Sequence, residues 1–223
     1  MSDTTPVRII LGARTRLGET LASRSADRQL RLVATSSRPT PSPDAAELVG
    51  GSGAPVEVVV CALGPVHPTE AQSELDHQVF RRDLEIVSDV LDRAEGRPVS
   101  VVLVSTVIAL APGDDRRYYG GWKNLVEGEL RDLVARHPGA GLAVLYPGRL
   151  VADRSFLHAT YGRLADRVDA LLAGRSVPAV VGLDARAWLA VATLRTALRA
   201  LLPGRTASRP SASPRPTESR SAA

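Results

Sequence analysis

Residues 7–18 read Val-Arg-Ile-Ile-Leu-Gly-Ala-Arg-Thr-Arg-Leu-Gly, a short apolar run that ends at a glycine and leads into a segment with helical spacing. The apolar run predicts a strand, and the pattern from Leu17 to Arg24 predicts a helix. In a strand, glycine turn and helix of this kind the loop can hold a pyrophosphate. Gly12 permits the tight turn, and Gly18 permits close packing of the helix on the sheet.

Along the rest of the chain, short apolar strands alternate with helical segments. The segment from Val56 to Ala62 is nearly all apolar and β-branched, which is typical of a strand buried on both faces of a parallel sheet. We therefore expect an α/β fold with a doubly wound, Rossmann-like parallel sheet, whose ligand lies beyond the carboxyl ends of the strands. Further strands are predicted at 32–35, 99–105, 142–145 and 178–181, and helices at 70–94, 119–136, 162–172 and 185–202, with at most one helical turn at 44–48.

The composition is that of a folded, water-soluble protein. Hydrophobic residues make up 44% and charged residues 23% of the 223 residues, which excludes a disordered, collagen-like or membrane-spanning chain. We expect one domain over residues 1–202, followed by a disordered tail at 203–223 that is rich in proline, serine and arginine. The single cysteine and the lack of a signal-peptide pattern at the amino end favour the cytoplasm.

The net charge of +4 is concentrated in the tail. From Gly204 onward there are four arginines and one glutamate, so only about +1 is left on the preceding residues. Without a basic stripe, and with 4% aromatic residues, the sequence argues against a nucleic-acid partner. A membrane partner is not expected either, because the apolar segment at 185–202 is too short and contains too many arginines to span a bilayer.

Arginines near the glycine loop bear on the choice of dinucleotide. Arg38 follows the second predicted strand, where the adenosine ribose of a bound dinucleotide would lie. An acidic residue there would bind the free ribose diol, whereas an arginine suits a 2′-phosphate. Arg14 and Arg16 add positive charge, so the sequence favours NADP(H) over NAD(H). The loop lacks the middle glycine of the common spacings, and Thr15 or Arg16 stands in its place.

Lys123 is the only lysine among 28 basic residues. A compact ammonium differs from a planar, permanently charged guanidinium, so we expect Lys123 to do something that arginine cannot. Tyr119 precedes it by four residues and shares its face of the predicted helix. Ser105 and Thr106 end the strand before that helix. The sequence therefore predicts a hydroxyl, a phenol and an ammonium near one edge of the sheet.

From about residue 7 to 151, the order of these motifs resembles that of the short-chain dehydrogenase/reductases. The resemblance implies a Rossmann fold and hydride transfer to or from a nicotinamide cofactor, in which Tyr119 exchanges a proton with the substrate. It also implies that Lys123 lowers the pKa of Tyr119 and binds the nicotinamide ribose. Either Ser105 or Thr106 would hold the carbonyl oxygen, since Ser105 fits the family by residue type and Thr106 by its spacing of thirteen residues. Cofactor binding is expected at Gly12, Arg14, Thr15, Arg16, Leu17, Gly18, Arg38, Ala62, Leu63, Gly64, Lys123, Pro147 and Gly148.

One departure from the family concerns Asp83, which stands where the family often has a catalytic asparagine. An aspartate cannot donate through an amide, so a non-catalytic dinucleotide-binding protein is the alternative from another functional class. A dehydratase or epimerase without net redox change is a third hypothesis. With about 50 residues between Gly148 and the predicted tail, a small carbonyl or alcohol substrate is favoured. The sequence is compatible with a homodimer.

Other titratable residues are expected to be structural. The histidines His67, His77, His137 and His158 lack metal-ligand spacing, so no metal site is predicted. Asp114 and Asp115 are expected to be solvated, and Glu127 to pair with Lys123 one turn earlier. Cys61 is expected to be an unreactive packing residue inside a buried strand.

Overall fold

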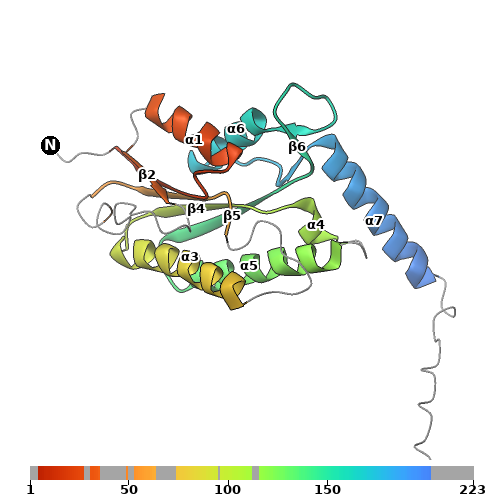
Figure 1. Ribbon diagram of the computed structural model, residues 1–223, viewed down its shortest axis with the longest axis horizontal. Helices are drawn as coiled ribbons and strands as arrows, with labels where there is room; N and C mark the ends of the chain where they lie inside the picture. Colours follow the sequence, from red (N-terminus) through yellow and green to blue (C-terminus); the bar gives the residue numbers. More distant parts are fainter. Residues whose placement is uncertain are drawn as a thin grey trace, which may run out of the picture.

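The computed structural model describes residues 5–27, 31–35, 49, 53–63, 74–94, 96–111 and 116–201. Within these residues, six parallel strands form the central sheet in the order β2-β1-β3-β4-β5-β8 (Figure 1). The strands are β1 (Val7–Leu11), β2 (Arg31–Thr35), β3 (Val56–Val60), β4 (Val99–Val104), β5 (Ala140–Pro147) and β8 (Val180–Val181). Predictions for 44–48, His67, Gly64, Arg38, Asp114, Asp115 and the tail at 203–223 lie outside the described residues.

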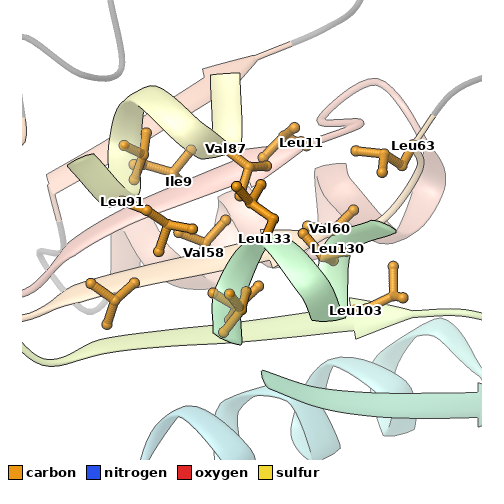
Figure 2. Close-up of a cluster of buried hydrophobic side chains, with 14 of the residues drawn as sticks. Ile9, Leu11, Val58, Val60, Leu63, Val87, Leu91, Leu103, Leu130 and Leu133 are labelled. Atoms are coloured by element: carbon orange, nitrogen blue, oxygen red, sulfur yellow. The ribbon is translucent and has the colours of Figure 1, made fainter. Parts of the chain in front are cut away.

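Helices cover both faces of the sheet, so the predicted doubly wound α/β fold is confirmed. On one face lie α1 (Arg16–Asp27) and α6 (Tyr161–Leu172), and on the other α3 (Glu74–Arg93) and α5 (Arg117–Ala135). Successive strand residues point to opposite faces. Ile9 accordingly joins the core under α3 and α5, which Figure 2 shows, whereas Ile10 joins the core under α1 and α6.

The strand order fixes where a ligand can bind. Strand β1 lies between β2 and β3, so the chain connects outward in opposite directions from it. The order 2-1-3-4-5 is one of the two common orders of doubly wound sheets, and its switch point lies between the carboxyl ends of β1 and β3. Gly12 follows β1 and Cys61 follows β3 there, and Cys61 N donates to Leu11 O at 3.0 Å. The glycine loop therefore borders the crevice at which such folds bind ligands.

Several boundaries differ from the sequence predictions. Strand β3 ends at Val60, so Cys61 lies just past the strand rather than inside it. Strand β5 is longer than predicted because it pairs with both β4 and β8, while β8 itself has only two residues. Three short elements were not predicted because a pattern needs more residues than they contain: α4 (Val107–Leu110), β6 (Leu150–Val151) and β7 (Ala159–Thr160). Helix α7 spans Leu183–Leu201.

A buried arginine in the sheet joins four elements of the fold. Arg8 of β1 is 2% exposed. Its Nε donates to Glu57 of β3 at 2.8 Å, and its Nη1 donates to Asp169 of α6 at 2.8 Å and to Ser25 of α1 at 3.2 Å. Each carboxylate therefore receives a charge-assisted hydrogen bond away from bulk water. This cluster connects α1 and α6 to the sheet through β1, the strand that leads into the glycine loop.

His137 gives the stability of the fold a pH dependence. Its Nε2 lies 2.8 Å from Asp92 Oδ1 and its Nδ1 lies 2.9 Å from Leu133 O. The hydrogen bond to Asp92, followed by the one to Leu133, raises the pKa of His137 above its usual value of 6.5. Since the folded pKa is the higher one, this stabilisation is complete below about pH 6.5 and is lost as the pH rises through the folded pKa.

We therefore expect the urea midpoint to fall between pH 6 and pH 8, and to fall less in Asp92→Asn, which removes the charge but keeps the shape. The difference should be below about 1 kcal/mol, because Asp92 is largely exposed. The measurement is urea unfolding of both proteins at several pH values. Parallel pH profiles for the two proteins would show that this pair contributes nothing.

Candidate active site

The glycine loop is closed by its own threonine. Gly12 has φ of +79°, a backbone conformation that favours glycine. The Thr15 hydroxyl donates to Gly12 O at 2.8 Å and accepts from Gly18 N at 3.1 Å. Thr15 is thus the N-cap of α1, and its side chain satisfies one of the amides that helix starts leave unpaired. The residue in place of the middle glycine therefore stabilises the turn.

Both glycines of the loop are required by close packing. A Cβ at Gly18 would overlap with the carbonyl oxygen of Gly12, and one at Gly12 would lie 2.9 Å from Ala62 N. These contacts agree with the predicted roles in turning the chain and in packing the helix on the sheet. The amides of Arg16 and Leu17 begin α1 and have no carbonyl partner within the helix. They remain able to bind an anion at the switch point.

Two hydroxyls follow β4, and the structure distinguishes them. Ser105 and Thr106 are each 8% exposed. Thr106 caps α4, because its Oγ1 accepts from Ile108 N at 3.4 Å. The Ser105 amide donates to Leu145 O at 2.8 Å, but the buried Ser105 Oγ has no hydrogen-bond partner in the described part of the chain. A buried hydroxyl without a partner is unfavourable unless a ligand supplies one.

Tyr119 and Lys123 lie one turn apart near the start of α5. The Lys123 Nζ is 5.6 Å from the centre of the Tyr119 ring, which is within the range of a cation–π contact. Within the described chain, no carboxylate forms an ion pair with Lys123, and burial lowers the pKa of its ammonium. A desolvated cation of this kind is stabilised by any ligand oxygen that reaches it.

The expected effect of Lys123 on Tyr119 is not found in this geometry. Burial raises the pKa of the Tyr119 phenol above its usual value, and the charge that opposes this rise belongs to Arg116. The Lys123 ammonium contacts the ring of Tyr119. Burial therefore sets the direction of the Tyr119 pKa shift here, and the lowering of that pKa by Lys123 stays a prediction.

A buried tryptophan fixes α5 in rotation. Trp122 is 1% exposed, and its ring makes edge-to-face contacts with His77 at 5.5 Å and Phe80 at 5.4 Å, both on α3. Because Trp122 points into the core, Tyr119 and Lys123 share a neighbouring side of the helix. Helix α4, which follows Ser105 and Thr106, packs against α5. The predicted hydroxyls, phenol and ammonium thus come from two elements in contact.

Other predicted residues have different surroundings. Asp83 is buried on α3, and Leu63 is buried after β3. Pro147 and Gly148 lie at the carboxyl end of β5, where a Cβ on Gly148 would overlap with the carboxylate of Asp184. A side chain at position 148 would therefore have to displace the Asp184 carboxylate at the start of α7, a contact that no local sequence pattern indicates.

Glu127 does not pair with Lys123 as expected. Its Oε1 accepts from the Tyr146 hydroxyl at 2.7 Å and lies 2.7 Å from Arg131 Nη2. Arg131 lies one turn after Glu127, the same spacing as the predicted pair in the other direction. Burial, together with Glu127, raises the pKa of Tyr146. Glu127 therefore does not occupy the Lys123 ammonium, which can bind a ligand, and Tyr146 joins the polar residues near α5.

The remaining candidates offer no second site. Burial raises the pKa of Cys61 to about 12, so its thiol stays protonated and unreactive. The described residues contain no group of three histidine, cysteine or acidic side chains that could hold a metal ion. A cavity of about 190 Å³ borders Val99 and Ala140, the first residues of β4 and β5. It therefore lies at the edge opposite the glycine loop.

No helix in the described part of the chain combines the length and apolar character needed to cross a bilayer. No protein-family model matches the sequence, and no curated protein matches it.

Solved structures of low sequence identity share the fold. A short-chain dehydrogenase from Burkholderia cenocepacia in complex with NADP is 15% identical with a TM-score of 0.59, covering 92% of this chain and 100% of its own. The bulky-bulky ketone specific alcohol dehydrogenase from Comamonas testosteroni is 16% identical with a TM-score of 0.54, covering 92% and 98%. UDP-N-acetylglucosamine 4-epimerase from Bacillus cereus is 15% identical with a TM-score of 0.54, covering 80% and 78%. The fold expected from the resemblance is confirmed.

Proposed function

We propose that this protein is an NADP(H)-dependent oxidoreductase that interconverts a small carbonyl compound and its alcohol. The observation that carries the proposal is the pair of unsatisfied groups at Ser105 and Lys123. The buried Ser105 Oγ has no hydrogen-bond partner and the Lys123 ammonium has no ion-pair partner among the described residues. Ser105 follows the carboxyl end of β4 and precedes α4, and α4 contacts α5, which carries Lys123. A ligand with oxygen atoms at this end of β4 would satisfy both groups.

The glycine loop fits a dinucleotide. The Arg16 and Leu17 amides at the start of α1 would bind the pyrophosphate, and the exposed side chains of Arg14 and Arg16 would add positive charge. Arg38, after β2, would meet a 2′-phosphate. Lys123 would bind the nicotinamide ribose through its ammonium. When bound, the nicotinamide supplies or accepts the hydride.

Residues of this chain would bind the carbonyl oxygen of the substrate and donate a proton to it. Ser105 is the better of the two hydroxyls for holding a carbonyl oxygen, because Thr106 Oγ1 already caps α4. Tyr119 keeps its proton at neutral pH because burial raises its pKa, so it can donate that proton to an alkoxide. A protonated phenol at Tyr119 favours the reduction of a carbonyl, because this direction needs a proton donor. Oxidation would require a bound ligand to bring the Lys123 charge to the phenolate.

A non-catalytic dinucleotide-binding protein remains the second candidate. Two observations favour it: Asp83 stands where the family often has a catalytic asparagine, and Lys123 contacts the ring of Tyr119. A binding protein has no need of an unpaired buried hydroxyl at Ser105, which is why we rank the enzyme first. The two functions differ in turnover and agree in cofactor binding.

The test measures binding and turnover in sequence. Binding of NADPH and NADH is measured by titration, and NADPH oxidation is then followed with a panel of small ketones and aldehydes. The enzyme proposal expects NADPH binding and saturable oxidation with at least one substrate. Cofactor binding without oxidation across the panel would favour the binding protein. Formation of product from an alcohol or sugar without net change of the cofactor would favour an epimerase.

Arg38 tests the choice of cofactor. If it meets a 2′-phosphate, Arg38→Asp should weaken NADPH binding by about 1.5–3 kcal/mol and leave NADH binding nearly unchanged. The measurement is titration of both cofactors, with the exposed Arg175→Asp as the charge-matched control. Equal affinities of the unmutated protein for NADPH and NADH would contradict the proposed preference.

A further inference from the structure

Helix α7 extends away from the body of the protein, and its second half is not covered by the described residues. Its first half is attached: Ala185 is buried, and Trp188 Nε1 donates to Ala111 O at 3.1 Å. From Thr193 to Leu198 every residue is exposed. Figure 1 shows the helix running outward from the edge of the sheet beside α4. An isolated helix of this length is marginal in water, so its second half gains stability from whatever covers it.

An apolar stripe runs along the uncovered side of α7. Its members recur at spacings of three or four residues, which places them on one side of the helix. They are Leu183, Ala187, Val191, Leu194 and Leu198, all exposed, with Leu194 at 59%. The residues turned toward the body, Ala185, Leu189 and Ala192, lie on a different side. The stripe therefore remains apolar surface that the body does not use.

The apolar surface continues past the start of the helix. Leu183 N and Asp184 N both donate to Leu157 O, at 3.0 Å and 3.2 Å. Leu157 is 50% exposed and its neighbour Phe156 is 87% exposed. These residues lie in the loop between β6 and β7, next to the exposed Arg154. A larger apolar surface than a single helix face is therefore available for contact.

Charge is divided sharply between the body and this end of the chain. Residues 185–223 contain seven arginines and one glutamate, a net charge of +6. Residues 1–184 contain 21 basic and 23 acidic residues, a net charge of −2. From 185 to 217 there is no acidic residue at all. Three of these seven arginines, Arg186, Arg195 and Arg199, lie on α7, and the other four follow it in the sequence.

We infer that α7 binds the protein to a membrane surface of anionic lipid, lying in the interface with its stripe toward the acyl chains. Arg186 and Arg195 are exposed and border the stripe on opposite sides, where guanidinium groups can reach lipid phosphates. The arginines beyond the helix add long-range attraction to an anionic surface. This inference stands apart from the proposed redox activity, and it replaces the expectation of no membrane partner, which considered only segments that span a bilayer.

A second copy of the chain fits the stripe less well. Pairing two α7 helices along their stripes would bring Arg186 and Arg195 of both copies together. No acidic residue of the helix after Asp184 could compensate these charges. An anionic surface satisfies the apolar stripe and the arginines at once, which is why we assign it as the partner.

The test is sedimentation of the full chain with vesicles. We expect binding to vesicles of equal parts phosphatidylglycerol and phosphatidylcholine, and binding about tenfold or more weaker to phosphatidylcholine alone. Salt at about 0.5 M should weaken the binding to the anionic vesicles. The double variant Leu194→Gln/Leu198→Gln should lower that binding by about tenfold or more. Leu125→Gln, an exposed leucine on α5, is the matched control and should bind normally.

A charge variant and the unfolding midpoints complete the design. Arg186→Gln/Arg195→Gln should weaken binding to the anionic vesicles and leave the weak binding to phosphatidylcholine unchanged. All variants should keep the unmutated thermal midpoint, because the replaced side chains are exposed. Equal binding to both kinds of vesicle, or full anionic binding by the double leucine variant, would overturn the inference. So would a dimer in sedimentation velocity that the leucine variant dissociates, in a protein that does not bind vesicles.

Discussion

Tyr119→Phe is expected to lower turnover by about 10²- to 10⁴-fold, the range that a positioned proton donor contributes. The substitution removes only the phenolic oxygen. NADPH binding should stay within a factor of about two, because the residues expected to hold the cofactor are unchanged. The measurements are turnover on a substrate identified with the unmutated protein and titration with NADPH.

Lys123→Arg belongs to the same experiment and should also collapse turnover. The guanidinium keeps the charge, but it is planar and bulkier than the ammonium and cannot occupy the same position against the Tyr119 ring. Lys123→Met should abolish turnover as well, while raising the thermal midpoint by about 2–4 °C, because it removes a desolvated cation that no described carboxylate pairs with. Such a gain in stability with loss of activity is typical of functional residues.

An exposed arginine provides the matched control for Lys123. Arg175→Lys makes the reverse exchange on the surface and should change neither turnover nor the midpoint. If Tyr119→Phe and Lys123→Arg both kept full activity on the same substrate, the proposed proton transfer would be wrong. The dinucleotide-binding protein or a different active site would then explain the structure better.

The sequence predicted the sheet well because its strands carry local signals. In β1, β3 and β4 almost every residue is valine, isoleucine or leucine, as burial on both faces of the sheet requires. The glycine loop was recognisable because Gly12 and Gly18 meet strict packing limits. Elements whose partners are distant in sequence were missed: β6 and β7 have two residues each and are held by each other.

At the site, residue types were predictable and their partners were not. The common sheet edge followed from the strand order. That Thr106 caps α4 and leaves the Ser105 hydroxyl without a partner depends on a four-residue helix that no pattern shows. Glu127 lies four residues from both Lys123 and Arg131, so spacing alone allowed it to pair with either. In the structure it pairs with Arg131, and it also accepts a hydrogen bond from the Tyr146 hydroxyl, which is distant in sequence. Local spacing cannot choose between such alternatives.

The buried ion cluster yields the largest expected effect on stability. Arg8→Met should lower the free energy of unfolding by about 3–5 kcal/mol, because it removes the cation from Glu57 and leaves Asp169 with the more distant Arg24, whose Nη1 lies 3.7 Å from Asp169 Oδ2. The side chains of Glu57 and Asp169 are only 15% and 3% exposed, so water can solvate neither well. Urea unfolding monitored by circular dichroism measures the loss.

Partners and surface pairs separate this effect from general damage to the core. Adding Glu57→Gln and Asp169→Asn to Arg8→Met neutralises the two carboxylates that lost Arg8, so the triple variant should recover a large part of the lost stability. Arg131→Met is the surface comparison, because the Arg131 side chain is 58% exposed where it pairs with Glu127, and it should cost less than about 1 kcal/mol. A loss below about 1 kcal/mol in Arg8→Met would mean that water reaches the two carboxylates. A triple variant no more stable than Arg8→Met would mean that the arginine acts through its packing rather than its charge.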